Sequence, residues 1–213
     1  MRFTVRNIIF ILTSTCVFLA LYFIFHETSD MTQISARNTD GVHCGRNSPC
    51  PPQHLAFLMH SGAASVVGPK LCLEENLILS NSMQNVGEGL NILFADGRTG
   101  KVLRSEHFNM YSGDVSLLIE FMKDIPPSTF VFVLSYDDAA SKLTPEVREI
   151  FQKLGSTAIK TIAFRDSWLF IGATDIKGPS PFEVVIKNDR DHNKYEGWPE
   201  RANLEGCIPL KQD

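Results

Sequence analysis

The 213-residue chain lacks the patterns that mark several common functional classes. It contains no HExxH motif, no Gly-x-Ser-x-Gly turn and no glycine-rich phosphate-binding loop. It has no basic excess either, because 20 Lys and Arg stand against 24 Asp and Glu, for a formal net charge of −4. Nucleic-acid binding usually needs a basic face. We therefore expect no enzymatic activity, no cofactor, no metal site and no nucleic-acid partner.

A long apolar run stands at the N-terminus, from Ile8 to Phe25, with no charged residue in it. It is close to the ~20 residues that a membrane-spanning helix needs. The basic residues Arg2 and Arg6 precede it, so the positive-inside rule places everything after Phe25 in the lumen or outside the cell. No small-residue cleavage site ends the run, which leaves a cleaved signal peptide and an uncleaved signal anchor both open. We assign residues 1–30 to this segment and the polar residues 31–43 to a linker.

Cysteine is scarce, and no N-x-S/T acceptor for N-glycosylation occurs. Cys16 lies inside the apolar run, which leaves Cys44, Cys50, Cys72 and Cys207. An even number of cysteines in a secretory context predicts two disulfides, and three pairings are possible. Cys207 is near the C-terminus, so at least one bridge must close a long loop. A zinc site is the weaker alternative, because no Cys-x2-Cys pair is present.

Short apolar runs dominate the region that follows the linker. Strand-like runs cover 54–60, 64–73 (interrupted by Gly68-Pro69), 76–79, 90–95 and 101–104. The last two runs flank residues 96–100, which include an Asp-Gly pair and a second glycine. This spacing is typical of a β-hairpin.

Two helices are predicted farther along the chain, over 112–125 and from Pro145 to about Gly155. Ser112 or Asp114 can cap the first helix, and Thr144 can cap the second. Between them, 129–134 has the β-branched and aromatic content of a buried central strand. Runs 158–164 and 168–173 indicate two more strands, and 182–186 indicates a last strand or a helical turn. The order of elements predicts an α+β domain, with a mixed or largely antiparallel sheet or two facing sheets carrying helices.

Polar residues adjoin the ends of two of these strands. Asp137 and Asp138 follow 129–134, and Arg165 precedes the strand that contains Trp168. Carboxylate and guanidinium groups can hydrogen-bond sugar hydroxyls, and a Trp ring offers a flat apolar face to a pyranose. If Asp137 and Arg165 face one another across neighbouring strand ends, they form one polar pocket. The alternatives are a turn or cap role for the aspartates, and an Arg165–Asp166 pair bracing a turn with Trp168 in the core.

Five segments, in order, carry a resemblance to known proteins: SGAASVVGPK (61–70), NVGEGLN (85–91), YDD (136–138), FRDSW (164–168) and NKYEGWPE (193–200). Together they resemble the secreted, cytokine-like family that includes interleukin-like EMT inducer and pancreatic-derived factor. The defining module of this family is called the GG-type lectin domain. The resemblance runs from about Cys44 to Asp213, so residues 44–213 are assigned to this domain.

The resemblance implies a compact β-rich, sandwich-like fold of two sheets with flanking helices, and the disulfides Cys44–Cys72 and Cys50–Cys207. It also implies a secreted, cytokine-like or hormone-like signalling protein whose partner is a cell-surface receptor or a glycan. The same module occurs in the stem of a Golgi sugar transferase, where it binds glycan using an Asp and an Arg in the regions of Asp137 and Arg165. The alternative is a type II lectin in the Golgi or ER lumen that contacts the membrane only through its uncleaved N-terminal segment.

Overall fold

The computed structural model describes residues 49–211, all within one compact unit, His43–Asp213. The predictions for the N-terminal segment (1–30), the linker (31–43) and Cys44 lie outside these residues. Within 49–211, no helix is long and apolar enough to span a membrane.

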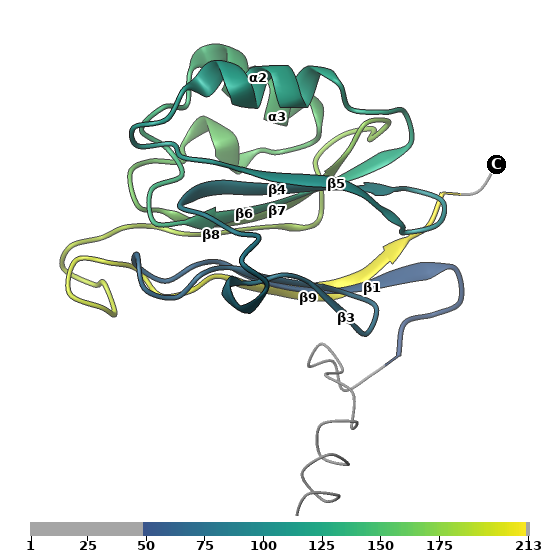
Figure 1. Ribbon diagram of the computed structural model, residues 1–213, viewed down its shortest axis with the longest axis horizontal. Coiled ribbons are helices and arrows are strands. Elements are labelled where there is room, and N and C mark those ends of the chain that lie inside the picture. Colours follow the sequence, from purple (N-terminus) through teal and green to yellow (C-terminus); the bar gives the residue numbers. More distant parts are fainter. Residues whose placement is uncertain (1–48, 212–213) are drawn as a thin grey trace, which may run out of the picture. The chain divides into compact units, whose positions relative to one another are not determined.

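Two antiparallel β-sheets form the domain (Figure 1). The smaller sheet has the strand order β3 (Asn76–Leu79), β2 (Lys70–Leu73), β1 (His54–His60) and β9 (Asn203–Pro209). The larger sheet has the order β5 (Val102–Phe108), β4 (Gly89–Asp96), β6 (Thr129–Tyr136), β7 (Ser167–Ala173) and β8 (Glu183–Ile186). The predicted pair of facing sheets and the predicted hairpin between β4 and β5 are confirmed.

The domain has three layers, with the five-stranded sheet in the middle. Helices α2 (Val115–Lys123) and α3 (Pro145–Lys153) cover one face of this sheet, and the four-stranded sheet covers the other (Figure 1). One core, which includes Phe151 and Trp168, fills the space between helices and sheet. A second core, which includes Phe57 and Phe132, fills the space between the sheets. Because it is covered on both faces, β6 is buried at every position, as the sequence predicted.

Both helices begin where their capping residues predicted. The Asp114 side chain accepts a hydrogen bond from the Ser116 amide at 2.9 Å, and Thr144 Oγ1 accepts one from the Val147 amide at 3.3 Å. These bonds satisfy amide groups that have no partner inside the helix. Gly155 follows α3 with a φ of +99°, a conformation that favours glycine after a helix end.

Three segments differ from the prediction. Of the run 64–73, only Lys70–Leu73 forms a strand, β2. The run 158–164 is not a strand, because it begins with the 3-10 turn η2 (Ala158–Lys160). The Glu183 carboxylate accepts hydrogen bonds from the Thr157 and Ala158 amides, which fixes this turn. Strand β9 was not predicted, and it pairs with β1 along its whole length. The ambiguous segment 182–186 contains strand β8.

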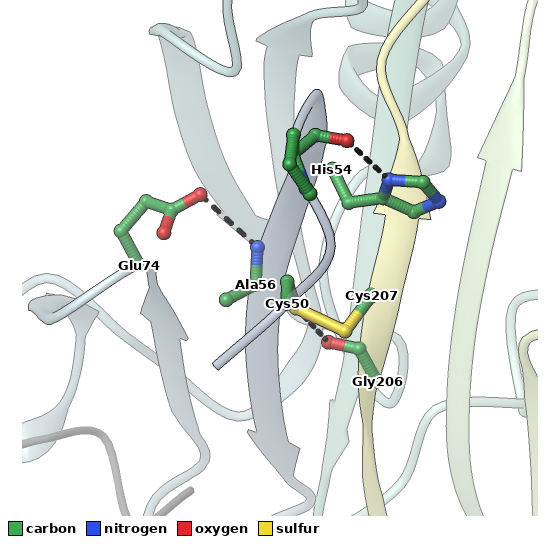
Figure 2. Close-up of a disulfide and its surroundings, with 7 residues drawn as sticks. Cys50, His54, Ala56, Glu74, Gly206 and Cys207 are labelled. Atoms are coloured by element: carbon green, nitrogen blue, oxygen red, sulfur yellow. Dashed lines mark hydrogen bonds between the residues drawn. A yellow bond between two sulfur atoms is a disulfide. The ribbon is translucent and has the colours of Figure 1, made fainter. Parts of the chain in front are cut away.

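The disulfide Cys50–Cys207 joins the residues before β1 to β9, with the two Cα atoms 5.7 Å apart. Figure 2 shows this bond beside Gly206. It also shows the Ala56 amide, which donates a hydrogen bond to the carboxylate of Glu74 in the turn between β2 and β3. The bond confirms one of the two expected pairings. The other pairing, Cys44–Cys72, stays a prediction because Cys44 lies outside the described residues.

Candidate functional site

The candidate site lies where β4 begins, β6 ends and β7 begins. Gly89 of β4 is paired with Tyr136 of β6, and Leu134 of β6 is paired with Leu169 of β7. Antiparallel neighbours place the end of one strand beside the start of the next. The loop after β6 and the loop before β7 therefore meet at the same end of the five-stranded sheet.

Asp137 and Arg165 occupy these two loops and face one another. Arg165 Nε lies 3.9 Å from Asp137 Oδ1, and the side chains are 34% and 24% exposed, respectively. Both residues have a positive φ, 63° for Arg165 and 56° for Asp137. This left-handed conformation is uncommon outside glycine, and such strained residues cluster at ligand-binding sites. The structure thus brings together the two residues that the sequence proposed as one polar pocket.

Aromatic rings surround the Arg165 guanidinium. Its central carbon lies 3.6 Å from the centroid of the Trp198 ring and 4.8 Å from that of Phe164. Cation–π contacts of this kind hold the guanidinium plane in place. Among the described residues, Arg165 Nε has no hydrogen-bond acceptor, since 3.9 Å is too long for a hydrogen bond to Asp137. Arg165 Nε is itself buried, whereas 34% of the Arg165 side chain as a whole is exposed, so a ligand can reach only the exposed part of this side chain.

The charge on Asp137 is disfavoured in this setting. Partial burial raises the pKa of the Asp137 carboxyl, the nearby Glu88 raises it further, and Arg165 opposes both effects. An ionised carboxylate accepts hydrogen bonds only, whereas its protonated form also donates one. Asp137 can thus pair with ligand hydroxyls in either state.

Asp138 has the turn role that was the alternative interpretation for this pair. It is buried, and its Oδ1 accepts hydrogen bonds from the Ala140 amide at 2.9 Å and the Ser141 amide at 3.3 Å. Its Oδ2 has no donor within residues 49–211. Asp138 therefore shapes the loop that carries Asp137.

Trp168 lies in the core and presents no ring face at the surface. It is fully buried, stacks on Phe170 with the ring centroids 5.7 Å apart, and donates from Nε1 to Glu183 Oε1 at 3.1 Å. This placement corrects the prediction that Trp168 offers a platform to a sugar. The aromatic surface beside Arg165 comes instead from Phe164, which is 44% exposed, and the half-buried Trp198.

Arg165 does not brace its turn through Asp166, as the alternative interpretation had it. Asp166 pairs with Lys187 at 2.7 Å and accepts hydrogen bonds from the Ala163 and Asn188 amides. This network fixes the loop before β7 and leaves Arg165 to pair with Asp137.

Three residues of the site were not assigned to it from the sequence: Glu88, Phe164 and Trp198. Trp198 belongs to the segment NKYEGWPE, which carried the family resemblance without an assigned role. A backbone bridge between Tyr195 and Trp198 turns that loop toward Arg165. Phe164 directly precedes Arg165, so its position in the sequence was the one available signal.

The fold and the site define a disulfide-linked two-sheet domain with a polar and aromatic surface on its end loops. Residues 88–176 match the family model described as interleukin-like EMT inducer. The chain is 53% identical over 170 residues to human Protein FAM3C, an alignment that covers 80% of this chain and 75% of that protein. It is 52% identical to human Protein FAM3D over 168 residues (79% and 75%) and 49% identical to human Protein FAM3A over 168 residues (79% and 73%). The chain belongs to this family, the interleukin-like EMT inducer family of the FAM3 proteins.

Proposed function

We propose that the chain is a secreted, cytokine-like signalling protein that acts at the cell surface and binds carbohydrate through its Asp137–Arg165 site. Membership of the interleukin-like family supports the signalling role. The observation that carries the binding role is the strained pair itself, in which Asp137 and Arg165 meet 3.9 Å apart beside Trp198.

Carbohydrate suits this surface because its chemistry has two parts. Sugar hydroxyls both donate and accept hydrogen bonds, which Asp137 and Arg165 can match from opposite sides. The apolar face of a sugar ring can lie on an aromatic side chain such as the exposed Phe164. A few fixed polar groups beside apolar surface are typical of small-ligand sites.

Mutation of Arg165 tests the site. Arg165→Ala removes the partly exposed guanidinium, and loss of one charge-assisted hydrogen bond of about 1.5–3 kcal/mol lowers affinity roughly 10- to 100-fold. We expect binding on a glycan array to disappear while the denaturant midpoint is retained. Lys101→Ala is a charge-matched control, because Lys101 is exposed at the far end of β4 and β5. Unchanged binding by Arg165→Ala, or an equal loss in the control, would remove Arg165 from the site.

A second candidate function is a type II lectin held in the Golgi or ER lumen. The apolar run from Ile8 to Phe25, which has no clear cleavage site, favours it. Expression of the full-length chain in animal cells, followed by intact mass of the protein in medium and membranes, separates the two. A soluble species that begins between residues 25 and 43 supports secretion. A species found only in membranes, with residues 1–25 retained, supports the anchored lectin and contradicts the signalling role.

A further inference from the structure

Glu88 stands across from Asp137 at the candidate site. Gly89 of β4 and Tyr136 of β6 are the last paired residues at this end of the two antiparallel strands, and Glu88 and Asp137 come next on each side. Side chains that stand opposite one another on antiparallel strands are close enough to interact, and like charges there repel. Glu88 is exposed, so a ligand that approaches Asp137 meets a second carboxylate.

Asp137 is itself a carboxyl group in this site, so its ionisation indicates how the site receives a carboxylate. Partial burial, Glu88 and Asp138 raise its pKa, and Arg165 does not outweigh them although its Nε lies only 3.9 Å away. A ligand carboxylate brought to the same place would lose hydration and meet the same charges, with that of Asp137 added. The site is therefore less favourable to an anion than to a neutral group.

Arg165 alone would favour the opposite preference, because a guanidinium group pairs well with a carboxylate. Asp137 already lies beside it, however, so an incoming carboxylate competes with one that is in place. Two lysines on the neighbouring loops add no unpaired cation, since each pairs with an acid. These pairs are Lys187–Asp166 at 2.7 Å and Lys194–Glu200 at 3.4 Å.

Given the carbohydrate-binding role proposed above, on which this step rests, we propose that the Asp137–Arg165 site takes neutral sugars and rejects sugars that carry a carboxylate. Glu88 helps to set this preference from its position across from Asp137. The hydroxyl groups of a neutral sugar can pair with Asp137 and with the exposed part of Arg165 without bringing a further negative charge to them.

A glycan array of matched sugars tests the proposal with charge as the variable. It carries glycans that end in sialic acid or a uronic acid, each beside its methyl ester and its neutral parent, and the full chain expressed in animal cells is applied to it. The ester keeps the sugar ring and removes the charge. We expect the acids to bind about tenfold more weakly than their esters, since burial and two like charges oppose them.

The outcomes separate this preference from the proposed function. Acids that bind as well as their esters, or better, with binding lost in Arg165→Ala, would overturn the preference and keep the carbohydrate-binding role. Binding of no glycan, neutral or acidic, would contradict the carbohydrate-binding role and the preference with it.

A charge-neutralising variant tests the part played by Glu88. In Glu88→Gln, acid binding relative to ester binding should rise about two- to fivefold, the effect of one screened charge, and folding is checked by the urea midpoint. Glu120→Gln, at an exposed position on α2, makes the same change in net charge and should leave this ratio as in the wild type. Added salt should narrow the wild-type difference between acid and ester, which a purely steric effect of Glu88 would not produce. An unchanged ratio in Glu88→Gln, or an equal rise in Glu120→Gln, would remove Glu88 from this role.

Discussion

Asp137 is a residue on which opposing effects act. Its backbone is held in the left-handed conformation, its carboxyl is partly buried near Glu88, and Arg165 alone favours its charge. The net result is a raised pKa, so the folded protein holds this proton more tightly than the unfolded chain does. A strained and electrostatically unfavourable residue is a cost to stability that a binding role would explain.

The pH dependence of stability should reveal this cost. Where the folded state binds more protons, the free energy of unfolding falls as the pH rises. Asp137 should therefore contribute a loss of stability as the pH rises from the ordinary range of an aspartate through its raised pKa. Acidic groups with a lowered pKa, such as Asp175, contribute in the opposite direction, so the Asp137 effect is measured as the difference between a variant and the wild type. Asp137→Asn has no proton to lose, and Asn tolerates a positive φ. Its urea-unfolding free energy should lack this decrease and exceed the wild-type value at neutral pH.

The control for this experiment is Asp191→Asn, at an exposed position in the loop before β9. This variant should keep the wild-type pH profile between pH 4 and 7. Parallel profiles for wild type and Asp137→Asn would show that the carboxyl carries no unfavourable charge in the folded state.

The Asp137–Arg165 pair could be predicted from the sequence because both residues lie next to the ends of predicted strands. Asp137 and Arg165 adjoin the ends of two strands that were both predicted, so their meeting needed only that β6 and β7 be neighbours. Trp198 lies 33 residues beyond Arg165 in a loop without regular structure, so no periodic pattern located it. Trp168 was misplaced because β7 is buried on both faces, and alternation along a strand then says nothing of exposure.

At the scale of elements, Glu183 at the start of β8 connects three parts of the domain. Its carboxylate accepts hydrogen bonds from Trp168 Nε1 on β7, from the Ser156 hydroxyl, and from the Thr157 and Ala158 amides at the start of η2. A short edge strand thus positions both the centre of the helix-side core and the turn that follows α3.

Glu183→Ala should be strongly destabilising for this reason. It leaves several donors without their acceptor, including the indole of the fully buried Trp168, at about 1–3 kcal/mol for a buried unsatisfied group. We expect a loss of about 3 kcal/mol in the free energy of unfolding, measured in urea with Trp fluorescence. Glu183→Gln keeps an acceptor oxygen and should lose less. Equal stability of the alanine variant and wild type would show that these bonds contribute nothing net.

The same contacts explain where element prediction failed. The run 158–164 has the β-branched and apolar content of a strand, yet Glu183, 25 residues from Ala158, bonds the amide at its start and fixes a 3-10 turn. Strand β9 was missed for the opposite reason, since its sequence does not look like a strand. The segment NLEGCIP mixes polar and apolar residues, contains glycine and ends in proline. Its strand conformation depends on pairing with β1, which no local pattern reports. Helices with sequence-encoded caps and strands with two buried faces were predicted correctly, since their signals are local.

At the scale of the whole molecule, the two ends of the domain are tied together. β1 and β9 are far apart in sequence and lie side by side at one edge of the smaller sheet, seen in blue and yellow in Figure 1. The Cys50–Cys207 bond links residues 157 positions apart across this pairing. In the unfolded chain such a bond closes a very long loop, and the entropy cost of closing a loop rises slowly with its length, so this bond restricts the ensemble more than a short loop does.

Cys207→Ser should therefore destabilise the whole domain. The chain-entropy model assigns about 4.7 kcal/mol to a loop of about 100 residues, and engineered cases usually give less, so we expect a loss of about 3–5 kcal/mol in urea unfolding. Cys50 should become reactive toward a thiol reagent. The double variant Cys50→Ser/Cys207→Ser should lose the same stability with no reactive thiol from this pair, which separates the lost constraint from any effect of a free cysteine. The β1–β9 hydrogen bonds remain in both variants, so the domain should still fold, and a denaturant midpoint equal to that of wild type would show that strand pairing alone holds the ends together.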